Sequence, residues 1–279
     1  MITKIMKHDF LALRKPLGIT IGLTLLTAIL SAIAVSILRN SVAVGATIFL
    51  LAFLGMLAAY LVYSIILLVH YYRSMYGKTG YFTMSIPARP TELFWAKSIF
   101  NLLALFLFAL VFFCGGLLLF TSIFLEDTTG AALKSFFTTK ETWQVAFLVL
   151  MTLLLSSISS VFFYQFIVTA GNGRPFLDRF GKVGGPILVA VLTYVGMQII
   201  GFLLMLFPGQ LVFFAPDAPF ISLNWDGVFF HLIGPIDPSE SNPVEPPAVP
   251  IWWLLGTGVL TVVAGYLTTI FLKKGTSLR

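Results

Sequence analysis

Six long runs without Asp, Glu, Lys or Arg constrain this chain more than any other feature. They span residues 17–38, 45–69, 98–120, 145–170, 187–207 and 251–272. A helix needs about 20 apolar residues to cross the roughly 30 Å hydrocarbon core of a bilayer. A helix also satisfies its own backbone hydrogen bonds, as lipid requires. The runs therefore predict an all-α integral membrane protein with six transmembrane helices in a single domain, residues 1–279.

Composition supports a membrane location and excludes an ordinary soluble domain. Hydrophobic residues make up 58% of the chain and charged residues 10%, and the mean hydropathy is +0.99. Soluble chains carry about 25% charged residues. The single cysteine, Cys114, lies within the third run and is interpreted as a packing residue.

The N-terminal segment, residues 1–16, predicts an amphipathic elbow helix lying in the membrane surface. Apolar residues recur there at helical spacing, and Pro16 is expected to end the pattern. The apolar residues are Ile2, Ile5, Met6, Phe10 and Leu13, and the polar ones are Lys4, Lys7, His8 and Arg14. The following run is too long for the core of a signal peptide, about 7 to 15 residues, so an uncleaved first span is favoured. The alternative interpretation, that residues 1–16 are a basic membrane anchor without a defined geometry, stays open.

Charge asymmetry predicts the orientation of the spans. Fourteen of the 17 Lys and Arg residues fall on the side of the N-terminus, whereas eight of the 11 acids fall on the other side. Basic loops stay in the cytoplasm. We therefore expect both termini in the cytoplasm, and we interpret the net charge of +6 as a result of topology rather than of nucleic-acid binding.

Two loops differ from simple connections between spans. The inner loop 70–97 contains glycine and proline breaks before Thr91, which is expected to cap a short helix with Glu92 in its first turn. The outer loop 208–250 mixes apolar pieces with a proline-rich acidic end. Its apolar part is too short to span and too apolar for open solvent, so re-entrant or interfacial helices are expected there.

The inner loop also contains Gly77, Lys78 and Thr79, which match the end of a phosphate-binding P-loop. That motif needs a first glycine five positions before the second, and this position is Tyr72. It also needs a preceding strand, but the preceding apolar run is far too long. A P-loop in this chain is therefore rejected.

Residues 72–99, "YRSMYGKTGYFTMSIPARPTELFWAKSI", resemble the segment after the second span in permease subunits of ATP-binding-cassette (ABC) exporters of the six-span type. That family has a Tyr-Gly-Lys-x-Gly-Tyr run, then a Pro, then a Lys that starts the third span, here Lys97. In the family this loop couples to a separate cytoplasmic ATPase. The resemblance implies coupling residues Tyr76, Gly77, Lys78, Gly80, Tyr81, Pro87, Arg89 and Glu92. A solvated loop with turn residues is the alternative.

The resemblance also implies partners and cofactors. The ATPase subunits would bind ATP and Mg, so this chain would be a transport subunit without a cofactor or ATPase site of its own. A second permease subunit, identical or homologous, would complete the path across the bilayer.

The lack of charged residues within the runs also favours a transporter driven by ATP over one driven by an ion gradient. Ion-coupled carriers usually place an ionisable residue within a span, and the six runs contain no Asp, Glu, Lys or Arg. A polar cluster in the fourth run is the candidate substrate path: Ser156, Ser157, Ser160, Tyr164 and Gln165. Hydrogen bonds between helices are the alternative role for these residues.

Two other classes of function stay open. A membrane enzyme needs converging catalytic or metal-ligating groups, but His8, His70 and His231 form no paired motif, so no catalytic or metal residues are assigned. A non-transporting membrane anchor or sensor partner fits the same topology. The sequence favours the permease subunit of an ABC exporter in a bacterial cytoplasmic membrane, with an amphipathic peptide, drug or lipid as substrate.

Overall fold

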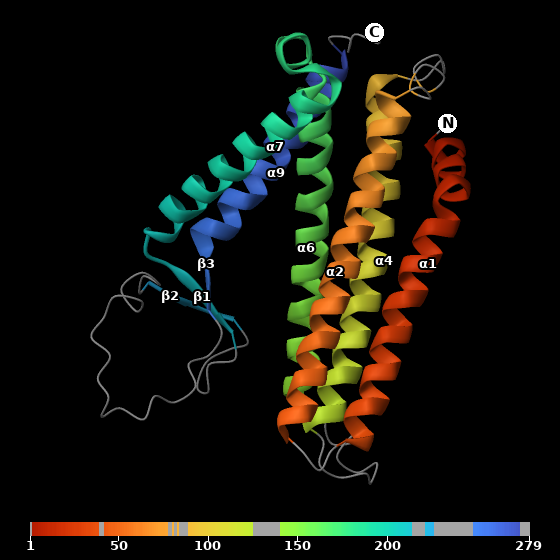
Figure 1. The fold of residues 1–279 in the computed structure, drawn as a ribbon. Helices are drawn as coiled ribbons and strands as arrows, with labels where there is room; N and C mark the ends of the chain where they lie inside the picture. Colours follow the sequence, from red (N-terminus) through yellow and green to blue (C-terminus); the bar gives the residue numbers. More distant parts are fainter. Residues whose placement is uncertain are drawn as a thin grey trace. The chain divides into compact units, whose positions relative to one another are not determined.

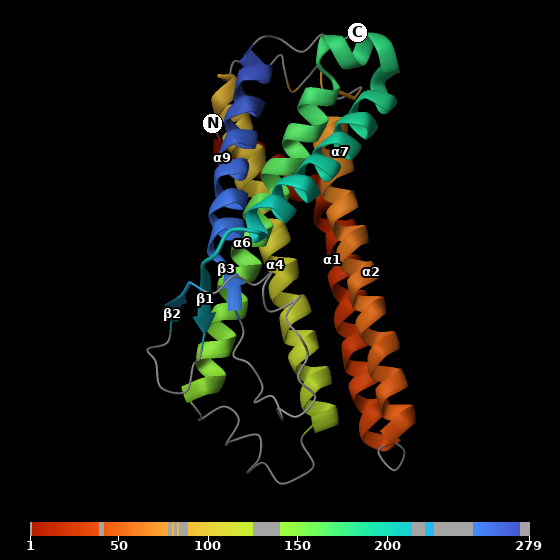
Figure 2. The same ribbon diagram turned by 90° about the vertical axis from the view of Figure 1, so that its left-hand side faces the viewer.

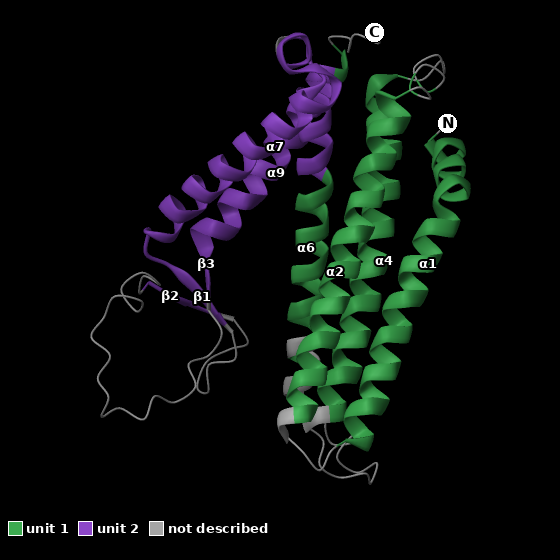
Figure 3. Ribbon diagram, in the orientation of Figure 1, with its two compact units in different colours: residues 1–161, 272–279 green, residues 162–271 purple. Residues whose placement is uncertain are grey.

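A computed structural model describes residues 2–38, 42–77, 80, 83, 89–124, 140–213, 221–225 and 248–273. The chain divides into two compact units (Figure 3). The first unit contains residues 1–161 and 272–279, and the second contains residues 162–271.

The first unit is built on three long helices that pack against one another: α1 (Ile2–Ile37), α2 (Val42–Met75) and α4 (Pro90–Phe124) (Figures 1 and 2). The first part of α6 (Lys140–Gly171) also belongs to it. Small side chains allow close packing of the three helices around one core cluster. That cluster contains Ala28, Ala32, Ala52, Met56 and Leu119.

These helices are longer than the apolar runs that the sequence shows. The 36 residues of α1 correspond to about 54 Å, well beyond the roughly 30 Å of hydrocarbon. Most of the extra length lies on one side of the runs: before residue 17 in α1, after residue 69 in α2 and before residue 98 in α4. The three helices therefore continue together past the apolar runs at the end that carries the N-terminus (Figure 1).

The second unit contains the rest of α6, α7 (Arg174–Met205) and α9 (Ile251–Lys273) up to residue 271. At the end of α6, Gly171 meets the backbone of Gly185 and Pro186 so closely that a Cβ atom would overlap it. Gly181 has φ 72° and divides α7 into a short helix, residues 174–180, and a long one. A residue with a side chain rarely adopts this φ, so glycine is required at the kink.

Three short strands lie between α7 and α9 in the sequence. They are β1 (Gln210–Phe213), β2 (Ile221–Asn224) and β3 (Ala248–Pro250), and they form an antiparallel sheet in the order β2-β1-β3. The expectation of re-entrant or interfacial helices in loop 208–250 is therefore wrong for the residues that are described. The described strands are three or four residues long, and strand pairing satisfies backbone groups without a helix.

The prediction of six apolar helices long enough to span a membrane is confirmed within the described part of the chain. The expected elbow is not seen as a separate helix, because α1 continues through Pro16. Buried Leu13 and Leu17 hold the helix on both sides of this proline. A separate short helix beginning at Thr91 is also not seen, since α4 begins at Pro90 and continues to Phe124.

Candidate functional site: a buried carboxylate at the ends of loop 70–97

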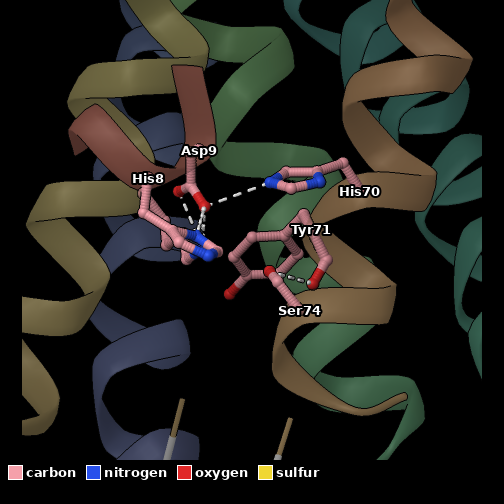
Figure 4. Close-up of polar contacts among 6 residues, drawn as sticks. His8, Asp9, His70, Tyr71 and Ser74 are labelled. Carbon is pink, nitrogen blue, oxygen red and sulfur yellow. Dashed lines mark hydrogen bonds and ion pairs between the residues drawn. The ribbon is translucent and has the colours of Figure 1, made fainter. Parts of the chain in front are cut away.

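Three ionisable side chains from three helices meet in the first unit, and we call them the Asp9 cluster: Asp9 from α1, His70 from α2 and Lys97 from α4. The Nζ atom of Lys97 lies 2.7 Å from both Oδ1 and Oδ2 of Asp9. The Nε2 atom of His70 lies 3.1 Å from Oδ1 of Asp9. Figure 4 shows His70 and Asp9 pointing toward each other from their two helices. One carboxylate therefore links three helices.

Burial makes the pairing energetically important. Asp9 is 1% exposed and Lys97 is 3% exposed. Removing one partner of such a pair leaves the other charge buried and uncompensated, which typically costs about 3–5 kcal/mol. His8 also approaches Oδ1 of Asp9, at 3.8 Å, but its side chain is 84% exposed, so solvent screens this contact.

Helical spacing places Asp9 and Lys97 on the buried faces of their helices. In α1, Asp9 lies one turn from both Ile5 and Leu13, and all three are buried. In α4, Lys97 lies one turn before Asn101, which is 1% exposed. The Oδ1 atom of Asn101 has no hydrogen-bond partner among the described residues. Polar side chains thus extend along the buried face of α4 into the first turn of the apolar run.

The helices α2 and α4 also contact each other directly, within the apolar runs. The hydroxyl of Tyr63 donates a hydrogen bond of 2.9 Å to the carbonyl oxygen of Ala104. The ring of Tyr63 stacks on Phe108 with 4.3 Å between the ring centroids. Both aromatic side chains are almost completely buried. The two helices are therefore joined directly within the apolar runs, and through Asp9 of α1 just outside them.

The cluster joins the two ends of the loop that the sequence singled out. His70 is the first residue of loop 70–97 and Lys97 is the last, and both bond to Asp9. All three residues lie outside the apolar runs, in the common extension of α1, α2 and α4. A movement of the loop would therefore be transmitted to three helices through the side chain of Asp9.

Five of the eight predicted coupling residues lie within the described part of this loop. The chain turns after α2, where the amide of Gly77 donates to the carbonyls of Tyr72 and Arg73, and the amide of Gly80 donates to the carbonyl of Gly77. The side chain of Tyr76 is partly buried. Three further predicted residues, Lys78, Tyr81 and Pro87, lie outside the described residues.

At the second end of the loop, Glu92 closes the start of α4. Its Oε2 atom accepts a hydrogen bond of 3.3 Å from the amide of Arg89, while the amide of Glu92 donates to the carbonyl of Arg89. This reciprocal pattern is one half of a capping box. The predicted helix start was thus placed close to the observed one, but the capping residue is Arg89 and not Thr91. The side chain of Arg89 is exposed.

The candidate path residues of α6 fall on two faces of the helix. Ser157, Tyr164 and Gln165 are buried, whereas Ser156 and Ser160 are exposed. Ser156 and Ser157 both donate to the carbonyl of Leu153, at 3.0 and 2.6 Å. Because residue 161 ends the first unit, these residues are divided between the two units. A path formed by all five stays a prediction.

Sequence reasoning missed the Asp9 cluster because its members are 61 and 88 positions apart. The apolar runs do lack Asp, Glu, Lys and Arg, but α1 and α4 extend beyond the runs and bury Asp9 and Lys97 there. One signal was present: Asp9 lies at helical spacing between Ile5 and Leu13, on the side where a surface helix would carry apolar residues. Among the described residues, no group of three His, Cys, Asp or Glu side chains could hold a metal ion.

Comparisons of the chain with protein-family models, with curated proteins and with solved structures found no match. The features of the chain that bear on its function are therefore the Asp9 cluster, loop 70–97 and the six apolar helices.

Proposed function

We propose that this chain is the membrane-spanning permease subunit of an ABC exporter in a bacterial cytoplasmic membrane. Separate cytoplasmic ATPase subunits would drive it, and both termini would be cytoplasmic. One observation carries the proposal: the loop that resembles a coupling segment has both of its ends bonded to Asp9. A partner that moves this loop would therefore move α1, α2 and α4 together.

The proposed mechanism uses two permease subunits, identical or homologous. The six helices of one subunit can hardly enclose a path across the bilayer by themselves. ATP binding with Mg would close the pair of ATPases and draw the two coupling loops together. The Asp9 cluster would carry this movement into the helices and switch the path from inward-facing to outward-facing. The apolar, aromatic-rich helices suit an amphipathic peptide, drug or lipid as the exported substrate.

The test is co-purification with a candidate ATPase, followed by measurement of hydrolysis with and without this chain. Gly80→Val is the central variant. A Cβ atom at position 80 would lie 2.5 Å from the carbonyl oxygen of Met75, so the turn has to change shape. The effect expected of Gly80→Val comes from this overlap and not from a positive φ at position 80. Among the described glycines, only Gly181 and Gly209 have a positive φ. Glu92→Arg is the second variant, since it removes the acceptor for the Arg89 amide.

Both variants should insert normally, bind less ATPase and uncouple hydrolysis from transport. Lys78→Ala tests the rejected P-loop, and it should leave this chain without nucleotide binding, as before the change. Normal coupling in both Gly80→Val and Glu92→Arg would count against a coupling loop. Intrinsic ATP binding that is lost in Lys78→Ala would restore the P-loop interpretation.

A second candidate function follows from the Asp9 cluster, namely a proton-coupled carrier. Carriers usually bind the coupling ion near the middle of the bilayer. Here Asp9, His70 and Lys97 lie outside the apolar runs, which favours the coupling role. Transport in vesicles separates the two: an ABC exporter needs ATP and its ATPase and continues when a protonophore collapses the proton gradient. Association with the ATPase without any transport would instead indicate an anchor or sensor partner.

A further inference from the structure

The short helix at residues 174–180 connects α6 to the long part of α7 and has no assigned role. Gly181, with φ 72° and ψ −177°, separates it from the helix that follows. Its amides at Phe176 and Leu177 bond back to the carbonyl of Gly173 at 3.1 and 2.9 Å. The segment is thus a defined helical turn, set at an angle by a glycine that tolerates this backbone conformation.

Close packing brings the two ends of this segment together beside the start of the apolar run of α7. The end of α6 at Gly171 touches the backbone at Gly185 and Pro186, where the apolar part of α7 begins. Residues 172–184 therefore form a connection whose two ends lie next to each other. A seven-residue helix is about 10 Å long, and the headgroup region on each side of the hydrocarbon is roughly 5–8 Å thick. The segment is therefore short enough to lie along the headgroup region if its two ends are at the membrane surface.

The short helix has two distinct faces. Phe176, Leu177 and Phe180 follow one helical face, and Arg174, Asp178 and Arg179 follow the other. Phe180 is 50% exposed, and Val183, just after the kink, is 65% exposed. Large apolar side chains this exposed beside a polar face are typical of helices that lie in the plane of a membrane interface.

We propose that residues 174–183 form a lipid-binding surface that takes anionic headgroups. Arg174, Arg179 and Lys182 outnumber the single acid, Asp178, and all four side chains are exposed. Cationic side chains next to a membrane are attracted to anionic lipid, each by about 1 kcal/mol. Phe180 and Val183 enter the boundary between headgroups and acyl chains, and the two arginines bind phosphate above it. This proposal does not depend on an ATPase partner.

The experiment uses the full chain reconstituted into vesicles, with Cys114→Ser removing the native thiol. Nitroxide labels are placed at Leu177→Cys and Asp178→Cys, one on each face. Their depth is measured from accessibility to oxygen and to a water-soluble nickel complex. In vesicles that contain phosphatidylglycerol, the label at position 177 should lie about 5–10 Å below the phosphates. The label at position 178 should stay in water.

Anionic selectivity is tested by comparing these vesicles with phosphatidylcholine alone. The label at position 177 should become shallower in phosphatidylcholine, and also when Arg174→Gln and Arg179→Gln are combined. Asp178→Asn is the matched control on the same helix, and it should keep the label at position 177 at least as deep. Equal depth in both lipids and in the double variant would overturn anionic binding. A water-exposed label at position 177 that becomes shielded only when a soluble ATPase is added would assign the surface to a protein partner instead.

Discussion

Asp9 accepts hydrogen bonds from two helices other than its own, and its burial leaves little water to compensate for a lost partner. Lys97 bonds to both carboxylate oxygens, and His70 lies within bonding distance of one of them. Charge-assisted bonds of this kind are about twice as strong as neutral ones. At the residue scale, the stability of the first unit should therefore depend on this carboxylate more than on any exposed charge.

The first prediction is that Asp9→Asn lowers the stability of the first unit markedly. The amide keeps the shape of the carboxylate but leaves the Lys97 cation buried without a counter-charge. The expected cost is about 3–5 kcal/mol, measured as a lower midpoint of thermal unfolding in detergent. Lys4→Gln removes an exposed charge from the same helix and should change the midpoint little. Equal midpoints for Asp9→Asn and Lys4→Gln would contradict the role given to Asp9.

The second prediction concerns the pair rather than its members. Lys97→Met combined with Asp9→Leu replaces a buried ion pair with apolar side chains of similar size, which is often neutral or stabilising. The double variant should therefore unfold at a higher temperature than Asp9→Leu alone. If the two changes are simply additive, Asp9 and Lys97 do not interact as their distances indicate.

At the scale of helices and strands, Glu92 and Gly115 show how single positions define an element. Glu92 closes the N-terminus of α4, where unpaired amides otherwise face solvent. Gly115 lies where α4 meets two neighbours: a Cβ atom there would be 2.7 Å from Cε of Met56 and 3.2 Å from Cβ of Ala28. The first position determines where α4 begins, and the second determines how closely it packs.

The third prediction is that Glu92→Ala loosens the start of α4, whereas Glu92→Gln largely preserves it. A glutamine side chain still offers an oxygen to the Arg89 amide, but alanine offers none. The expected loss for alanine is about 0.5–1 kcal/mol. Hydrogen exchange at the amides of residues 89 and 91–93 is the measurement, since Pro90 has no amide hydrogen. Faster exchange in Glu92→Gln than in Glu92→Ala would exclude the capping role.

The fourth prediction uses two adjacent glycines of α4. Gly115→Val should destabilise the packing of α1, α2 and α4 by about 1–3 kcal/mol, because the added methyl groups meet Met56 and Ala28. Gly116→Val is the matched control, since a Cβ atom at position 116 would have nothing within 4 Å of it. Both variants change helix propensity equally, so a difference in unfolding midpoint isolates packing. Equal midpoints would show that the core tolerates the added volume.

At the scale of the whole molecule, the distribution of charge predicts how the chain lies in the membrane. Lys and Arg concentrate on the side of the N-terminus, and acids concentrate on the other. The proposed partners depend on this orientation, because a cytoplasmic ATPase reaches loop 70–97 only if that loop is inside the cell.

The fifth prediction tests that orientation directly. A membrane-impermeant thiol reagent added to intact cells should label Ser239→Cys and should not label Thr79→Cys, both in a Cys114→Ser background. Permeabilised cells provide the control, since both positions should then react. Labelling of Thr79→Cys alone in intact cells would invert the topology and remove the proposed ATPase contact.

The sequence alone determined the membrane class and the six helices, because about 20 uncharged apolar residues suffice to specify a span. It also predicted a helix start within two residues of the observed start of α4, since Glu acts locally at a helix N-terminus, but it assigned that start to a separate short helix. It failed at Pro16 and in loop 208–250. In both places, packing or strand pairing by distant residues satisfies the backbone in a way that local patterns do not show.

Only the tertiary structure decided which charges are buried. Asp9, His70 and Lys97 each look like ordinary polar residues flanking an apolar run, and the only local sign of burial is the helical spacing of Asp9 between Ile5 and Leu13. Their meeting depends on three helices that extend past the runs and pack together there. Burial and pairing are properties of this packing and not of any one segment, because a charge is stable out of water only where another element supplies its partner.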